Sequence, residues 1–156
     1  MDTPVVTEER ENRYLLDTHT WIWWHIAPEK LPLWVKDFIS DPPGNSQSEI
    51  SPLLLSSISV WEFCKLVQKG RLILSVDSRQ WIEKAIRMTG LFLVPLSPDI
   101  AYYSSTLPEG CPSDPADQII AATARTFNAT VITKDEQLLR YSHVKTAWER
   151  DDCPGS

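Results

Sequence analysis

Four short apolar runs along the chain have the length of buried strands. A continuous apolar run, without alternation between apolar and polar residues, is typical of a strand that is covered on both faces in a parallel sheet. The predicted strands are Tyr14–Leu16, Leu53–Ser56, Leu91–Leu96 and Thr130–Thr133.

Segments with helical spacing separate these strands. In Ser78–Arg87, for example, Trp81 and Ala85 fall on one face of a helix. Strands that alternate with helices indicate an α/β fold, in which helices cover both faces of a mostly parallel sheet. The predicted helices are Thr20–Ile26, Leu33–Ile39, Val60–Gln68, Ser78–Arg87, Pro98–Ser105, Pro115–Phe127 and Glu136–Arg140.

Length and composition place these elements in one domain. The chain has 156 residues, of which 42% are hydrophobic and 23% are charged, as in globular domains that fold without disulfides or a structural metal. We predict flexible acidic tails at residues 1–12 and 149–156 around a domain at residues 13–148, with a turn-rich surface loop at 41–48.

The sequence indicates neither a membrane protein nor a secreted one. Its apolar stretches fall far short of the roughly 20 residues that cross a bilayer. The N-terminus is acidic, whereas a signal peptide begins basic and then turns apolar. The three cysteines are widely spaced and form no CxxC pair, which argues against a disulfide framework or a cysteine-based zinc site. We therefore expect a soluble protein of the reducing cytoplasm.

The net charge of −6 is concentrated at the two ends of the chain. Between Arg13 and Trp148 there are 14 acidic and 13 basic residues. If four of these acids bound metal ions, the remaining body would be mildly basic. The charge pattern therefore permits a nucleic-acid partner, although no cluster of Lys and Arg signals one.

Four carboxylates occupy positions where a strand is followed by a helix: Asp17 after the first strand, Glu62 in the first turn of the helix after the second, Asp117 in the first turn of Pro115–Phe127, and Asp135 after the fourth strand. The carboxyl ends of parallel strands line one edge of a sheet, and ligands bind there. Acids gathered at that edge repel one another unless a cation compensates them. An all-oxygen ligand set without His or Cys favours Mg²⁺ or Mn²⁺, which suits phosphodiester hydrolysis.

Helix capping is the alternative explanation for each acid taken singly. Asp17, Asp114 and Asp135 each precede a predicted helix and suit an N-cap. The pattern Ser59-x-x-Glu62 fits a capping box, and Asp117 is a favourable anion in the first turn of its helix.

Four motifs occur in order along the chain: Leu15-Leu16-Asp17-Thr18, Ser57-x-Ser59-x-x-Glu62, Asp114-Pro-Ala-Asp117-x-Ile-Ile-Ala-Ala-Thr-Ala and Val131-Ile-Thr-x-Asp135. Their order and spacing resemble those of PIN-domain ribonucleases over residues 13–148. Asp17-Thr18-His19-Thr20-Trp21 and Val60-Trp61-Glu62, with Lys69-Gly70-Arg71-Leu72 after them, are similar to VapC-type toxins of bacterial toxin–antitoxin pairs. Cys111-Pro112-Ser113 departs from the His- or Arg-containing stretch often found there in relatives.

The resemblance implies a three-layer α/β/α sandwich and a Mg²⁺- or Mn²⁺-dependent endoribonuclease, with RNA as substrate, a cognate antitoxin as partner and a homodimeric state. By that likeness Asp17 and Asp135 bind the metal directly and Asp117 binds it directly or through water. Glu62 positions or deprotonates the attacking water. Two further residues match auxiliary positions: Asp114, an extra acid or an N-cap, and Thr133, which holds a metal-bound water or a carboxylate or simply ends a strand.

Other conspicuous residues permit two interpretations. Trp21, Trp23 and Trp24 cannot all face one core, because neighbouring side chains on a helix diverge by about 100°. We expect core packing, with a partner or dimer contact for one of them as the alternative. His19 is expected at the surface, with a substrate contact as the alternative. Four basic residues suit either a solvated surface or binding of RNA phosphates: Lys65, Lys69, Arg71 and Lys134.

Three functions remain in view. The preferred one is the ribonuclease toxin, whose antitoxin strand or helix occupies the groove at the site. A haloacid-dehalogenase-like phosphatase also begins with a strand and an Asp, but it requires Asp-x-Asp, and His19 stands at the third position. The third is a non-catalytic protein-interaction module whose acids only cap helices.

Overall fold

The computed structural model describes residues 12–42, 52–88 and 90–149. Within them, five parallel strands form one sheet in the order β3-β2-β1-β4-β5. The strands are β1 (Tyr14–Leu16), β2 (Leu53–Ser56), β3 (Phe92–Val94), β4 (Thr130–Ile132) and β5 (Lys145–Ala147). The sheet is parallel throughout, which confirms the predicted α/β class.

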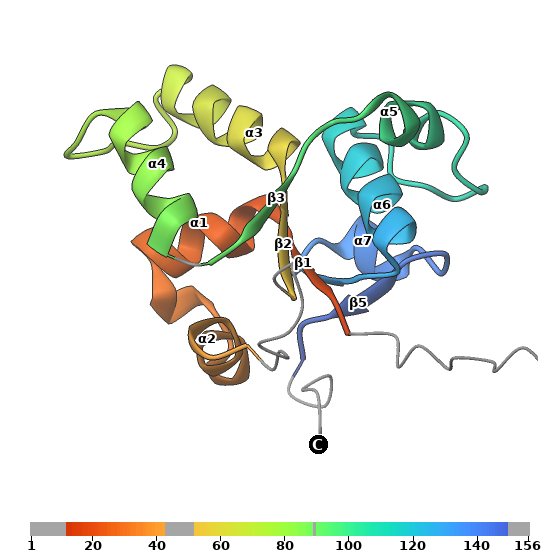
Figure 1. Cartoon of the computed structure of the whole chain (residues 1–156), viewed down its shortest axis with the longest axis horizontal. Coiled ribbons are helices and arrows are strands. Elements are labelled where there is room, and N and C mark those ends of the chain that lie inside the picture. The colour runs from red at the N-terminus through yellow and green to blue at the C-terminus, as the bar shows by residue number, and fades with distance from the viewer. Residues whose placement is uncertain (1–11, 43–51, 89, 150–156) are drawn as a thin grey trace, which may run out of the picture.

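Helices cover both faces of the sheet (Figure 1). One layer holds α1 (Thr18–Ile26), α2 (Leu33–Ser40), α3 (Ser57–Gln68) and α4 (Ser78–Met88), and the other holds α5 (Pro98–Ser104), α6 (Pro115–Phe127) and α7 (Glu136–Arg140). Each layer packs on its own hydrophobic core. Because successive side chains of a strand point to opposite faces, Tyr14 and Leu16 enter the first core and Leu15 enters the second. The predicted three-layer sandwich is therefore confirmed.

The strand order places a switch point between β1 and β4. From β1 the chain builds outward through β2 and β3, and it then returns to add β4 and β5 on the other side of β1. In such sheets a crevice opens where the chain changes direction, at the carboxyl ends of the strands. Ile132 at the end of β4 joins the two sides here, because its carbonyl oxygen accepts hydrogen bonds from Asp17 N at 3.1 Å and Thr20 Oγ1 at 2.8 Å.

Two helices begin earlier than predicted, and this corrects one local interpretation. Helix α3 begins at Ser57, with Ser56 as the N-cap whose hydroxyl accepts from Ile58 N at 3.2 Å. The last residue of β2 therefore also caps the helix, with no loop between them. Ser59 lies inside the helix and Glu62 in its second turn, so the predicted capping box and the first-turn position of Glu62 are both wrong. Helix α1 likewise begins at Thr18 and not at Thr20.

The edge strand β5 and the 3₁₀-helix η1 (Pro28–Lys30) were not predicted. Strand β5 reads Lys-Thr-Ala, which is exposed, half-buried and buried in turn, so it lacks the apolar run of the inner strands. The predicted tails, except Asn12 and Glu149, and most of the predicted loop at 41–48 lie outside the described residues.

The tryptophans of α1 pack against the first core. Trp21 is fully buried, whereas Trp23 and Trp24 are only partly buried against the same cluster. Core packing is thus confirmed for Trp21, and the other two keep part of their surface exposed. Among the described residues, no helix combines the length and apolarity needed to cross a bilayer.

Candidate functional site

Asp17 lies at the switch point and is almost completely buried. It ends the turn from β1 into α1, where its Oδ1 accepts from Thr18 N at 2.8 Å as the N-cap of the helix. Its Oδ2 accepts from Thr133 Oγ1 at 2.6 Å, and His19 Nδ1 lies 3.4 Å from the same oxygen. The capping interpretation and the site interpretation are therefore compatible, because they use different oxygens of one carboxylate.

Thr133 connects Asp17 to Asp135. Its fully buried hydroxyl donates to Asp17 and accepts from Asp135 N at 2.9 Å. Asp135 in turn caps α7, since its Oδ1 accepts from Gln137 N at 2.8 Å and from Leu138 N at 3.1 Å. Thr133 thus holds a carboxylate, one of the roles predicted for it, and fixes the segment that carries Asp135.

Glu62 reaches the site from α3. Its Oε1 accepts from Thr18 Oγ1 at 2.6 Å, and Ser59 Oγ lies 2.8 Å from the same hydroxyl. Thr18 is also the residue whose amide is capped by Asp17. Thr18 and Ser59 therefore position Glu62 against Asp17. Both stand in the sequence motifs, but only three-dimensional contact reveals what they do.

Asp114 and Asp117 belong to the start of α6. Asp114 is the N-cap, as predicted, and its Oδ1 accepts from Ala116 N at 2.8 Å. Asp117 is half-buried in the first turn, and its carboxylate accepts no hydrogen bond from the described residues. Its burial is therefore not compensated by local donors.

The electrostatics show that the acids face one another. Burial, followed by the charges of Asp17, Asp135, Asp114 and Glu62, raises the pKa of Asp117 from its ordinary value of 3.8 to about 7. Burial also raises the pKa of Glu62, in the same direction as the charges of Asp17, Asp114 and Asp135, while the hydrogen bond from Thr18 lowers it. The structure therefore brings the four predicted acids, with Asp114, to one edge of the sheet.

The chemistry of the acids suits a hard divalent cation. All the donors are carboxylate oxygens, and their mutual repulsion is what a bound cation would relieve. In the described part of the chain, however, no three Asp, Glu, His or Cys side chains are already gathered closely enough to form a metal site. A bound ion would therefore need water or substrate oxygens to complete its shell, as Mg²⁺ commonly does.

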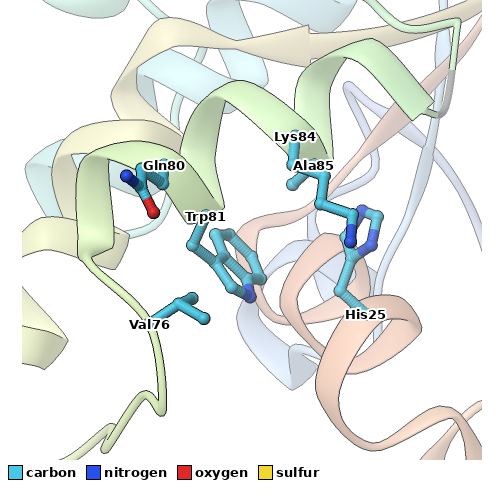
Figure 2. Close-up of a pocket in the computed structure, with 6 residues that line it drawn as sticks. All are labelled: His25, Val76, Gln80, Trp81, Lys84 and Ala85. Atoms are coloured by element: carbon cyan, nitrogen blue, oxygen red, sulfur yellow. The ribbon is translucent and has the colours of Figure 1, made fainter.

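A separate cavity of about 460 Å³ lies between α1 and α4 (Figure 2). His25 of α1 and Trp81 of α4 line it and pack edge to face, with their ring centroids 5.5 Å apart. Burial lowers the pKa of His25 to about 4, and its Nε2 atom has no hydrogen-bond partner among the described residues. The lining includes none of the acids, so this cavity is distinct from the candidate site.

The fold and the site together define the class: an α/β/α protein that carries a cluster of acids at the switch point of a parallel sheet. Comparison with known proteins identifies the family. Residues 14–144 match the family model described as PIN domain. The chain therefore belongs to the PIN-domain family.

One curated relative and several solved structures resemble the chain over most of its length. The sequence is 28% identical to Ribonuclease VapC22 of Mycobacterium tuberculosis over 139 residues, which cover 86% of this chain and 97% of that protein. The structure resembles VapBC2 from Rickettsia felis bound to a promoter DNA fragment, with a TM-score of 0.60, 18% identity, and coverage of 87% of this chain and 98% of that one. It also resembles VapBC-1 from nontypeable Haemophilus influenzae, with a TM-score of 0.60, 20% identity, and coverage of 86% and 96%. At these identities the structural matches establish the fold alone.

Proposed function

We propose that this protein is an endoribonuclease that depends on Mg²⁺ or Mn²⁺ and is the toxin of a toxin–antitoxin pair. The observation that carries the proposal is the convergence of acids from four distant segments at the switch point of the sheet, where burial and then the charges of the neighbouring acids raise the pKa of Asp117 to about 7. The similarity to a protein named as a ribonuclease supports the reaction class. PIN ribonucleases generally need a divalent metal, and the all-oxygen donor set suits one.

In this proposal Asp17, Asp117 and Asp135 would hold the metal. When bound, the ion supplies a Lewis acid that polarises the scissile phosphate and stabilises the leaving oxygen. Thr133 keeps Asp17 oriented through its 2.6 Å hydrogen bond. Asp114 caps α6 and adds negative charge beside Asp117, as an auxiliary acid.

Glu62 is the residue best suited to handle the proton of the attacking water. Burial raises its pKa above the ordinary value, which makes its carboxylate a stronger base than that of an exposed glutamate. Thr18 donates to Oε1 and so fixes the direction in which the carboxylate points.

An antitoxin, a homodimeric state and a cytoplasmic location belong to the same proposal. The solved relatives include complexes described as VapBC and as a toxin–antitoxin complex from Klebsiella pneumoniae. We expect an antitoxin strand or helix to lie over the acids. Sedimentation of the purified chain tests the dimer, and co-purification with the product of a neighbouring gene tests the antitoxin.

The activity is tested by incubating the purified protein with several structured RNAs and Mn²⁺. We expect cleavage by wild type, none with EDTA and none by Asp17→Asn. Asp37→Asn is the matched control, because Asp37 is exposed on α2 and lies outside the acidic cluster. Equal RNA survival with wild type and Asp17→Asn would favour the non-catalytic module. Release of phosphate from small phosphomonoesters would favour the phosphatase.

A further inference from the structure

Two lysines that are distant in sequence meet on one tryptophan. Lys30, at the end of η1, places Nζ 5.4 Å from the centroid of the Trp23 ring, and Lys134, between β4 and α7, places Nζ 5.9 Å from the same ring. An ammonium over an indole face is attracted by the negative potential of the ring. The half-buried Trp23 therefore gathers two positive charges that would otherwise repel each other.

This group of side chains is connected to the acidic site. The rings of His19 and Trp23 are 4.8 Å apart, and His19 Nδ1 lies 3.4 Å from Asp17 Oδ2. On its other side, His19 Nε2 accepts a hydrogen bond from Lys134 N at 3.1 Å. Since Nε2 is the acceptor, the ring proton of a neutral His19 lies on Nδ1 and faces Asp17. His19 lies partly at the surface, as expected, with 29% of its side chain exposed, and it also links the acidic site to the segment that carries Lys134.

The aromatic base of the group is fixed by packing. The buried ring of Trp148 lies 6.2 Å from Trp23 and 6.1 Å from His19, both in edge-to-face geometry. The Trp23 ring is therefore packed against Trp148, whereas Lys30 and Lys134 are both exposed. Packing therefore fixes the ring on which the two exposed lysines lie.

Neither ammonium is neutralised by a carboxylate within the described parts of the chain, where the ion pairs involve other residues. Both charges are therefore available to an anion. The neighbouring acids repel a polyanion, so a nuclease of this kind needs positive charge close beside them. Lys134 provides it just after β4, and Lys30 adds a second charge on Trp23, one turn along α1 from His19.

We propose that Lys30 and Lys134, positioned by Trp23, bind backbone phosphates of the RNA strand beside the acidic site. This inference rests on the proposed ribonuclease function and names the residues that hold its substrate. The lysines contact phosphate, and Trp23 acts as a positioning residue through them. Phosphate contacts of this kind fix the register of a strand without reading its sequence.

The test measures binding of a fluorescein-labelled RNA that the wild-type protein cleaves. All proteins carry Glu62→Gln, which keeps an acceptor for Thr18 but blocks proton transfer, so the RNA stays intact. Removing each phosphate contact lowers the slope of log K against log salt by about 0.7 for a single strand. For the double variant Lys30→Gln with Lys134→Gln we expect a slope lower by about 1.4. The ratio of the parent's affinity to that of the double variant should therefore fall about sevenfold when the salt rises from 50 to 200 mM.

Lys145→Gln is the matched control. It removes one positive charge, from the first residue of β5, at the opposite edge of the sheet from the acids, and we expect little change in slope. If the double lysine variant and Lys145→Gln show the same affinity and slope, the inference is wrong. If the parent without Glu62→Gln cleaves RNA normally in that case, the proposed function stands and only the inference falls.

Trp23 is tested separately. In the Glu62→Gln background we expect Trp23→Leu to lower the salt slope, and with Glu62 intact we expect it to raise KM with kcat unchanged. Trp23→Phe should restore part of both, because phenylalanine keeps a weaker cation-binding face. Thermal unfolding of each variant shows whether the fold is intact. Weaker binding by a folded Trp23→Leu with an unchanged slope would show that the ring stacks on a base, and would overturn its role in positioning the lysines.

Discussion

Replacing Asp117 by asparagine removes a charge that the folded protein holds at a cost. The side chain is half-buried in the first turn of α6, it faces four other carboxylates, and its pKa is raised to about 7. Asparagine has nearly the same shape and no charge. We therefore expect Asp117→Asn to be more stable than wild type at pH 8 in EDTA, where the wild-type carboxylate is mostly ionised and no metal compensates it.

The size of this effect follows from two opposing contributions. Each pH unit between the ordinary pKa of 3.8 and the folded value of about 7 corresponds to about 1.4 kcal/mol. The resulting ceiling of about 4 kcal/mol falls to roughly 1–2 kcal/mol for a half-buried group that solvent partly screens. An anion in the first turn of a helix favours folding by about 0.3–1 kcal/mol, and asparagine loses this. The cost of burial and repulsion is larger than the helix contribution, and the net gain of about 1 kcal/mol raises Tm by roughly 2–4 °C.

The pH dependence gives a sharper test, because a second group acts in the opposite direction. The raised pKa of Asp117 contributes stability that is fully present below pH 3.8 and is lost as pH rises through about 7. The lowered pKa of His25 contributes stability that is present above pH 6.5 and is lost as pH falls through about 4. Between pH 4 and 6.5 these two slopes offset each other in wild type. Asp117→Asn removes one of them, so its stability should fall more steeply toward acid.

Thermal unfolding from pH 4.5 to 8 in EDTA measures both effects, with Asp37→Asn as the control for loss of an exposed acid. A lower Tm for Asp117→Asn at pH 8, or a pH profile parallel to that of wild type, would refute the reasoning. It would mean that the helix start gains more from the anion than the acidic cluster loses.

Three further predictions concern the metal, Thr133 and His25. Millimolar Mg²⁺ or Mn²⁺ should raise the Tm of wild type but not of Asp17→Asn, since a ligand that binds only the native state stabilises it; an unchanged wild-type Tm would argue strongly against a competent site. Thr133→Val should lower stability by about 1–3 kcal/mol in denaturant titration, because the buried Asp17 Oδ2 loses the hydroxyl that donates to it, while Thr133→Ser should restore most of it; equal stability of the two would show that the hydroxyl contributes little. His25→Phe should flatten the loss of stability below pH 6 that Asp117→Asn exposes, and a steep profile in the double variant would assign that loss to another group.

The parts of the fold that local sequence determines were predicted well. Helix α6 has the predicted bounds because Asp114 and Pro115 form an N-terminal signal that needs no tertiary contact. The inner strands β1 and β2 are apolar on both faces, so their short runs identify them. The acids at the ends of these strands and helices could be expected at one edge once the sheet was taken to be parallel.

The parts that depend on distant contacts were not predictable in the same way. At the start of α3, Ser56, Ser57 and Ser59 are all good capping residues, and only the contact between Ser59 and Thr18 shows which of them faces the site. The meeting of two lysines on Trp23 joins three separate segments of the chain. Periodicity and spacing along the sequence do not predict contacts between such distant segments.

Asp17 and Asp135 are both helix N-caps and members of the acidic cluster, and this restricts which substitutions can remove activity while the protein remains folded. Each starts a helix with the same carboxylate that it presents to the acidic edge, whereas Glu62 and Asp117 cap nothing. Inactive descendants that still fold should therefore carry asparagine, serine or threonine at the first two positions, because these side chains also cap helices. At Glu62 and Asp117, drift among many residue types should be tolerated once selection for catalysis is gone.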